Sequence, residues 1–349
     1  MRATLVVHLP GAGDELQREI AQIVALLARG HPLIERLETF GETELRGMSD
    51  AQLKERLGEG HEELYYAHDA VGTICRRLAA AYPSARKVCT GDAFGMIYTA
   101  ESLPARSARA TLGALARRLA AMLAGKTPLA PVRPDVAALV LPVDVSGNGL
   151  RDVPLVCCRK EDFLAAIDFC HANAADLRAH MHDLMNRHQG RRRYLLLTEN
   201  YAEAGHASLD NEVAMYCEVI RRHCASEGVV LVKPHPLEAA GKDALIARRL
   251  AGEYQVVGVD RRFARYPIEL WREAVLGASV ICTAYPVLSL KYAYGIDVAQ
   301  PMNDELIDRW LEPAHRQWSR DGLRLYAGPL ARLARWDGQS VLWSGGNRA

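Results

Sequence analysis

The residues best suited to chemistry follow an apolar run, VVLV (229–232), which is typical of a buried strand. They are Lys233 and His235, and His235 stands between Pro234 and Pro236. Ligands bind at the carboxyl ends of strands in open α/β sheets, where a histidine can donate to a phosphate oxygen and a lysine adds positive charge. We therefore predict an anion site at His235, Lys233 and Pro236. A strand-ending turn in which His235 caps a carbonyl explains the same residues equally well.

Two hydroxyl residues and a carboxylate follow further along the chain. Thr283 ends an apolar run, and Ser289 lies in a helix expected over 287–294. Hydroxyls and free amides at a helix start can bind an anion, although both residue types are also common helix caps. Glu269 lies in the helix expected over 267–277, where its carboxylate can accept from ribose hydroxyls or simply favour the helix start.

The first half of the chain presents a carboxylate in a glycine-rich turn. Asp92 lies between Gly91 and Gly95, directly after a strand expected at 86–90. The glycines permit a sharp turn, and a carboxylate at a strand end can act as a general base toward a hydroxyl. An Asx-turn is the alternative interpretation.

Four weaker candidates lie at other strand ends. His68 follows an expected strand, and Thr198 and Asn200 end the first expected strand of the second half, where they could contact a ligand. Gly11 begins Gly-Ala-Gly, but Leu16 leaves the dinucleotide fingerprint incomplete, so this segment is expected to be a backbone-lined cleft loop. Because the residues supply too few ligands for a metal site, we expect no metal.

Composition restricts the class of protein. The chain has 349 residues, a net charge of +1, 49% hydrophobic residues and eight cysteines with no CxxC pair. This length favours two domains, and the near-zero charge argues against nucleic-acid binding. The cysteine pattern suits a reducing cytoplasm, and no apolar run is long enough for a membrane span. A basic stretch at 106–133 is an ordinary solvated helix or a contact with an anionic acceptor or membrane surface.

Strand and helix patterns alternate along most of the chain, which favours mainly parallel sheets with helices on their faces. The first strand is expected at 3–8, and the pattern is regular from the apolar run after Arg193 onward. We place the domains at 1–188 and 189–302, followed by a helical segment over 303–349 that packs back on the first domain.

The ordered set of motifs resembles the bacterial sialyltransferase and polysialyltransferase-like family. The motifs are GDAFG (91–95), LTENYAEAGHASLDNEVAMY (197–216), VVLVKPHP (229–236) and ICTAYPVLSLKYAYG (281–295). The resemblance implies a GT-B architecture, in which two Rossmann-like domains face each other across a cleft. It also implies an inverting, metal-independent transfer of a sialic or related acid from a CMP-sugar to a glycan in surface polysaccharide synthesis.

Carried over by position, the resemblance assigns the general base to Asp92 and the CMP phosphate to His235 with Pro236. Thr283 and Ser289 would assist at the phosphate. The acidic motif departs from the family pattern of two acidic residues before a glycine, and the two hydroxyls are not adjacent, since Ala284, Tyr285 and Pro286 are among the residues between them. The expected partners are a CMP-sugar and a glycan or glycolipid, with no cofactor and a cytoplasmic location that includes peripheral membrane contact through 106–133.

Three alternatives remain open from the residues alone. The first is a CMP-Kdo transferase of the same architecture. The second is a UDP-sugar epimerase of GT-B shape, which needs no acceptor. The third is a non-catalytic protein that binds a nucleotide sugar.

Overall fold

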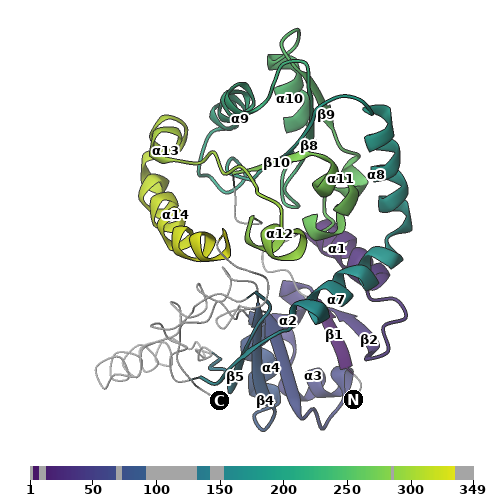
Figure 1. Cartoon of the computed structure of the whole chain (residues 1–349). Helices are drawn as coiled ribbons and strands as arrows, with labels where there is room; N and C mark the ends of the chain where they lie inside the picture. Colours follow the sequence, from purple (N-terminus) through teal and green to yellow (C-terminus); the bar gives the residue numbers. More distant parts are fainter. Residues whose placement is uncertain are drawn as a thin grey trace. The chain divides into compact units, whose positions relative to one another are not determined.

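The computed structural model describes residues 3–7, 13–67, 73–91, 132–141, 153–283 and 287–334 (Figure 1). The described residues divide into two compact units, of which the first ends at Phe163 and the second begins at Leu164. Each unit contains a four-stranded parallel sheet.

The first unit contains two parallel sheets. Its described strands are β1 (Ala3–Val7), β2 (Ile34–Thr39), β3 (Glu63–Ala67), β4 (Arg86–Gly91), β5 (Val136–Leu139) and β6 (Leu155–Cys157). β1 pairs with β2, and the other sheet has the order β3-β4-β5-β6. The described helices are α1 (Asp14–Leu27), α2 (Glu42–Gly47), α3 (Asp50–Leu57) and α4 (Thr73–Ala81), and α7 (Lys160–Asn173) contains the division between the units.

Helices α2, α3 and α4 surround a small apolar core in the first unit. Phe40, Leu45 and Leu53 are fully buried in it. Helix α3 follows Ser49, whose hydroxyl accepts from the Gln52 amide while the Gln52 side chain accepts from the Ser49 amide. This capping box satisfies two amides that a helix start leaves unpaired, so local sequence determines where α3 begins.

The second unit is built on the sheet β10-β7-β8-β9, in which every pair of neighbours is parallel. Its strands are β7 (Arg193–Leu197), β8 (Val229–Lys233), β9 (Gln255–Gly258) and β10 (Ser279–Cys282). All five residues of β8 are buried. Continuous apolar runs of this kind are typical of parallel strands that are covered on both faces.

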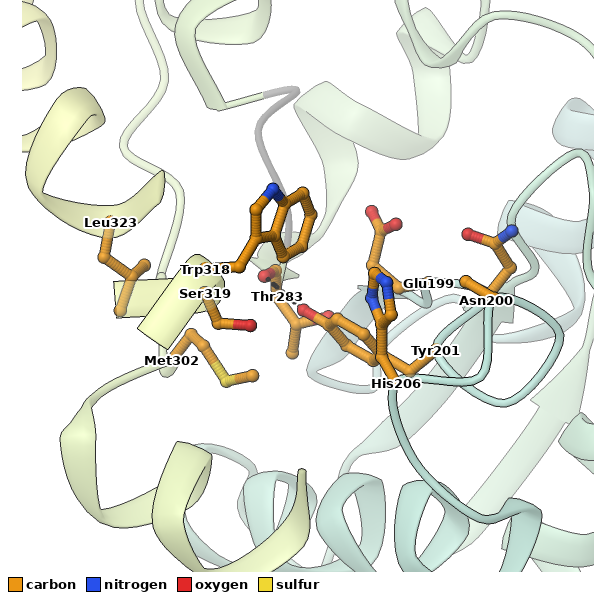
Figure 2. Close-up of a pocket in the computed structure, with 10 residues that line it drawn as sticks. Glu199, Asn200, Tyr201, His206, Thr283, Met302, Trp318, Ser319 and Leu323 are labelled. Carbon is orange, nitrogen blue, oxygen red and sulfur yellow. Dashed lines mark hydrogen bonds between the residues drawn. The ribbon is translucent and has the colours of Figure 1, made fainter. Parts of the chain in front are cut away.

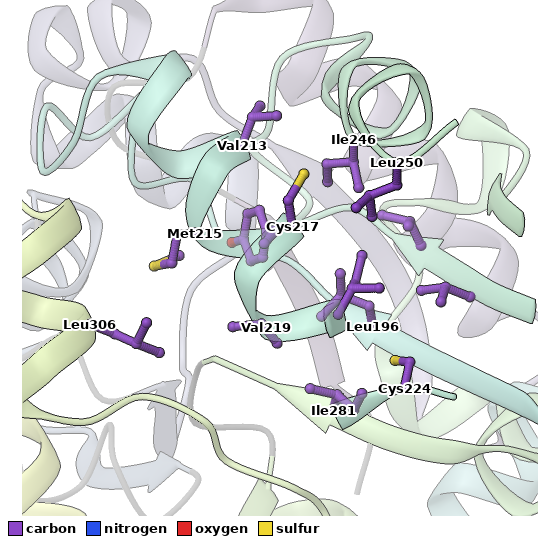
Figure 3. Packing of buried hydrophobic residues seen from close by; sticks show 14 of the residues in the cluster. Leu196, Val213, Met215, Cys217, Val219, Cys224, Ile246, Leu250, Ile281 and Leu306 are labelled. Carbon is purple, nitrogen blue, oxygen red and sulfur yellow. The ribbon is translucent and has the colours of Figure 1, made fainter. Parts of the chain in front are cut away.

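Helices cover this sheet and complete its core. They are α8 (Ala175–Arg187), α9 (Leu209–His223), α10 (Lys242–Arg249), α11 (Arg272–Gly277), α12 (Val287–Tyr294), α13 (Asp304–Trp310) and α14 (Pro313–Ala334), with short 3-10 turns at η1 (Arg261–Phe263) and η2 (Ile268–Leu270). Figure 3 shows Val213 and Val219 of α9 in the cluster that contains Leu196 of β7 and Ile281 of β10. Burial of these side chains is the main stabilising contribution to the second unit.

The strand order of the second unit reverses next to β7. The chain passes from β7 to β8 and β9 on one side, and then places β10 on the other side of β7. Leu197 at the end of β7 is aligned with both Lys233 of β8 and Cys282 of β10. The three strands therefore end at one level, and ligands bind at such a reversal in open α/β sheets.

The predicted α/β class, with two Rossmann-like units of parallel sheet, is confirmed. Helices α13 and α14 belong to the second unit, where α13 contacts α9 and α14 contacts α12. The predicted boundary at residue 188, the packing of 303–349 on the first domain and the cleft between the two sheets stay predictions. No helix in the described ranges combines the length and apolar character of a membrane span.

Gly228, just before β8, offers a test of how tightly the second unit is packed. A Cβ at this position would lie 2.7 Å from Cε2 of Tyr194 and 3.0 Å from the carbonyl oxygen of Arg192. The Tyr194 ring cannot easily move, because it is buried and its hydroxyl accepts from the Ala225 amide at 2.9 Å. We expect Gly228→Ala to lower the free energy of unfolding by about 1–3 kcal/mol.

Thermal unfolding of the two variants Gly228→Ala and Gly47→Ala checks this expectation. A Cβ at Gly47 would meet nothing within 4 Å, so Gly47→Ala serves as the matched control and should unfold at or above the wild-type temperature. Equal unfolding temperatures for the two variants would contradict the close packing around Gly228.

Candidate functional site

A pocket lies beyond the carboxyl ends of β7 and β10 (Figure 2). Its walls come from the loop after β7, from the end of β10, from the segment before α13 and from α14. The lining residues are Glu199, Asn200, Tyr201, Ala204, His206, Thr283, Met302, Trp318, Ser319 and Leu323. The pocket therefore occupies the strand reversal at which sheets of this kind bind their ligands.

The loop after β7 is held in place by α9. The Glu199 amide donates to the hydroxyl oxygen of Tyr216 at 2.6 Å, and the Ala202 amide donates to Oε2 of Glu212 at 2.8 Å. Gly205 has a φ of 74°, which favours glycine, and allows the loop to turn back toward α9. These bonds position Glu199 before any ligand arrives.

A buried ion cluster lies behind this loop. The Lys242 ammonium lies 2.7 Å from Glu212, 3.3 Å from Glu203 and 3.6 Å from Glu238, measured to the carboxylate oxygens. It also donates to the backbone carbonyl of Glu199 at 3.1 Å. We call Lys242 with Glu203, Glu212 and Glu238 the Lys242 cluster. Its three carboxyl groups surround a single ammonium, so the cluster makes further negative charge nearby unfavourable.

Carboxylates of the Lys242 cluster contribute to the raised pKa of the Glu199 side chain. Burial, followed by the charges of Glu212 and Glu238, raises the pKa of Glu199 to about 8. Burial likewise raises the pKa of Glu238 to about 7. Glu199 therefore keeps its proton at neutral pH and can donate it within the pocket, which is the property required of a general acid.

His206 is the second titratable group of the pocket. Its ring lies 4.4 Å from that of His315 and 4.9 Å from that of Trp318, measured between centroids. Burial, followed by the charge of His315, lowers the pKa of His206. The imidazole is therefore neutral at pH 7 and can accept a proton. One pocket thus holds a protonated carboxyl and an unprotonated imidazole, and Figure 2 shows both side chains at it.

Three of the sequence-predicted residues lie in or next to this pocket. Asn200 and Thr283 line it, and the Tyr201 hydroxyl donates to the Thr283 carbonyl at 3.2 Å, which joins the loop to β10. Thr198 is buried behind the lining residues and donates to Oε2 of Glu238 at 2.5 Å. Asn200 and Thr283 are thus available to a ligand, whereas Thr198 holds the Lys242 cluster to the strand end.

The Lys233–Pro236 segment follows β8 at the same sheet edge, but it does not line the pocket. Nδ1 of His235 accepts from the Leu237 amide at 3.2 Å, and burial together with Lys233 and Lys242 lowers the pKa of His235 to about 4. A neutral His235 then carries its proton on Nε2. The Lys233 ammonium is buried and donates to the Ala264 carbonyl at 2.9 Å. A phosphate role for His235, Lys233 and Pro236 stays a prediction.

Glu269 and Ser289 are brought together, although neither lines the pocket. The Ser289 hydroxyl donates to Oε1 of Glu269 at 2.5 Å. The Tyr294 hydroxyl donates to the backbone carbonyl of Glu269. These bonds join η2 to α12, and the predicted contacts of Glu269 and Ser289 with a donor stay predictions.

Most of the site residues predicted in the first half of the chain are not among the described residues. Asp92, Gly11, His68, Gly95 and residues 106–131 lie outside the described residues. Gly91 ends β4, where it pairs with Leu139 of β5. The general base at Asp92, the absence of a cofactor, the cytoplasmic location and the membrane contact through 106–133 therefore stay predictions.

The sequence patterns did not single out His206, Trp318 or Ser319, and they indicated Glu199 only as part of the strand-end segment 198–200. Glu199 lies between two residues that were predicted, Thr198 and Asn200, and its position at the end of β7 was the available signal. The other three residues reach the pocket only through the packing of α14 and of the loop after β7, which no spacing in the sequence reports.

No family model and no curated protein matches the chain. Among solved structures, it is similar to UDP-GlcNAc 2-epimerase from Neisseria meningitidis bound to UDP-GlcNAc, with 11% identity, a TM-score of 0.46, and coverage of 96% of this chain and 94% of that chain. It is also similar to S. aureus MnaA in complex with UDP, with 11% identity, a TM-score of 0.41, and coverage of 97% and 93%.

These comparisons correct the function predicted from the motifs. The predicted resemblance to the sialyltransferase-like family, the inverting glycosyl transfer, the CMP-sugar donor and the glycan acceptor are wrong, because one of these solved structures is a UDP-GlcNAc 2-epimerase bound to UDP-GlcNAc and the other is bound to UDP. The physical reason lies in the motifs themselves. Polar residues after apolar strands mark the ligand-binding edge of any Rossmann-like sheet, and they specify neither the nucleobase nor the reaction.

Proposed function

We propose that the chain is a nucleotide-sugar epimerase that binds a UDP-sugar at the pocket beyond β7 and β10. The observation that carries the proposal is the pairing of two groups in that pocket, a protonated Glu199 and an unprotonated His206. The proposal adopts the epimerase alternative that the residues left open.

Inversion of a carbon atom by proton transfer at its two faces requires both groups. One group must remove the proton from one face of the carbon, and another must supply a proton to the opposite face. A transferase needs only a base for its acceptor hydroxyl, so the acid–base pair favours an epimerase. Environments that make one group an acid and its neighbour a base are a recognised sign of such roles.

The leaving group of a nucleotide sugar indicates which carbon reacts. The nucleoside diphosphate departs from the anomeric carbon, so the adjacent carbon can lose its proton as that bond breaks. His206 takes the proton, the C–H electron pair forms a C=C bond, and the C–O bond electrons leave with UDP. Return of UDP to the anomeric carbon, with a proton from Glu199 added to the other face, gives the epimer. Exchange with water then resets the two groups.

Reaction in D₂O tests this proposal. The protein is incubated with UDP-GlcNAc, UDP-glucose and UDP-galactose, and with CMP-activated sialic acid as a comparison, and products are followed by proton NMR. We expect one UDP-sugar to give a second sugar nucleotide that carries deuterium at the inverted carbon. Failure of every UDP-sugar to give either an epimer or solvent deuterium would refute the proposal.

A further inference from the structure

The wall that α14 contributes to the pocket combines an aromatic ring with a buried hydroxyl. Trp318 is 53% exposed and Ser319 is 6% exposed, although they are neighbours in sequence. Met302 and Leu323 add apolar surface beside them. An exposed tryptophan at a pocket offers a flat apolar face to a ligand.

Two buried hydroxyls of the pocket have no partner among the described residues. They are Oγ1 of Thr283, at the end of β10, and Oγ of Ser319, on α14. The two residues are 3% and 6% exposed. Buried hydroxyls in folded proteins nearly always have a hydrogen-bond partner, so two exceptions from different elements in one pocket point to a ligand that supplies the partners.

The charge of the pocket restricts the ligand. None of the described residues that line it is Lys or Arg, and Glu199 is among them. Phosphate recognition relies on cationic side chains and helix amides, so the diphosphate is a poor occupant. A sugar ring fits the wall, because it presents a C–H face for stacking and hydroxyls for hydrogen bonds.

We infer that the α14 wall is the sugar-ring subsite, in which Trp318 stacks on the ring while Ser319 and Thr283 bind its hydroxyls. This inference rests on the proposed function for the identity of the ligand, a UDP-sugar. Beyond the proposed function, it states that the pocket recognises the sugar ring of the ligand and that α14 determines which sugars bind.

Isothermal titration with two ligands, UDP-GlcNAc and UDP, tests the subsite. Loss of one neutral hydrogen bond should weaken binding of UDP-GlcNAc by about five- to tenfold in Ser319→Ala and in Thr283→Val. Binding of UDP, which lacks the sugar, should not change. Ser279→Ala, at an exposed serine that begins β10, is the matched control and should bind both ligands as wild type does.

Trp318 provides a second pair of variants. Trp318→Phe keeps an aromatic face and should retain most of the affinity for UDP-GlcNAc, whereas Trp318→Ala should weaken it by about tenfold or more. The melting temperature of unliganded Ser319→Ala should equal or exceed that of wild type, because the substitution removes a buried hydroxyl that has no partner. A folding defect is thereby separated from a binding defect.

The outcomes distinguish this inference from the proposed function. Equal loss of UDP and UDP-GlcNAc binding in the variants would make the wall a nucleotide subsite and overturn the inference. Unchanged binding of both ligands in the variants would also overturn it. So would a wild-type protein that binds no UDP-sugar. Sugar-selective loss without deuterium exchange would support the subsite and refute the epimerase. Deuterium exchange in the wild-type protein, with unchanged binding of both ligands in the variants, would support the epimerase and overturn the sugar-ring subsite.

Discussion

Glu199→Gln is expected to lower kcat for sugar epimerisation by about 10²–10⁴-fold, the usual contribution of a positioned acid or base. The amide of glutamine keeps the size of the carboxyl but cannot deliver a proton. The dissociation constant for the UDP-sugar should change little, because the role proposed for Glu199 is proton transfer to the reacting carbon. Steady-state kinetics with the deuterium assay and titration with UDP-GlcNAc measure the two quantities separately.

Glu253→Gln is the matched control for this substitution. Glu253 is exposed and pairs with Arg221 at 2.8 Å on the surface. Its loss should leave kcat within about twofold of wild type, since surface ion pairs contribute little. A Glu199→Gln enzyme with near-normal turnover would remove Glu199 from the acid role and leave the proton transfer without an identified donor.

The pH profile of epimerisation should depend on the protonation of Glu199 and of His206. Epimerisation should fall above about pH 8, where Glu199 loses the proton it must donate. On the acidic side it should fall as His206 becomes protonated, at a pH below the ordinary histidine range because burial lowers the pKa of His206. The residual rate of Glu199→Gln should lack the alkaline decline, which a profile of kcat from pH 5 to 10 would show.

Glu199 should also make stability depend on pH. Its pKa rises from 4.5 to about 8 on folding, so between these values the folded chain binds more protons than the unfolded chain. Stability contributed by this group is then fully present below about pH 4.5 and is lost as pH rises through about 8. Relative to wild type, Glu199→Gln should therefore gain melting temperature between pH 5 and pH 9. A constant difference would contradict the raised pKa.

The sequence predicts the elements of the second unit well because its local signals agree with its packing. The apolar run before Lys233 becomes the fully buried β8, and Ser208 caps α9, as its hydroxyl accepts from the Asn211 amide at 3.2 Å. The first unit is less regular. β2 has the sequence IERLET, in which charged and apolar residues do not alternate, so no strand was predicted there, and three-residue β6 is too short to give a pattern.

Helix bounds and site residues show where local patterns fail. The residue pattern over 161–188 predicts a single helix, but the structure has α7 and α8, which meet at Ala174. The polar residues at strand ends correctly indicated the edge of the sheet at which the pocket lies. Two of these residues, Asn200 and Thr283, line the pocket. The raised pKa of Glu199 arises first from burial and then from the charges of Glu212 on α9 and Glu238 before α10, which are distant in sequence, so periodicity and spacing could not have indicated it.

Lys242→Met is expected to lower the free energy of unfolding by about 3–5 kcal/mol, the usual cost of removing one partner from a buried ion pair. Both Lys242 and Glu212 side chains are almost completely buried, and their charged atoms are 2.7 Å apart. Methionine fills similar space but leaves the Glu212 carboxylate without a cation. Urea unfolding at pH 7 measures the change, which should shrink at low pH as Glu212 takes up a proton.

The double variant Lys242→Met/Glu212→Gln distinguishes charge from packing. It removes the unpaired carboxylate, so much of the lost stability should return, whereas a pure packing defect would persist. Lys291→Met is the surface control, since Lys291 pairs at 2.5 Å with the exposed Asp297 and its loss should cost less than about 1 kcal/mol. Lys242 also favours the ionised form of Glu199. Where Lys242→Met still folds, the alkaline decline of epimerisation should therefore move to higher pH, which would link the Lys242 cluster to the proposed acid.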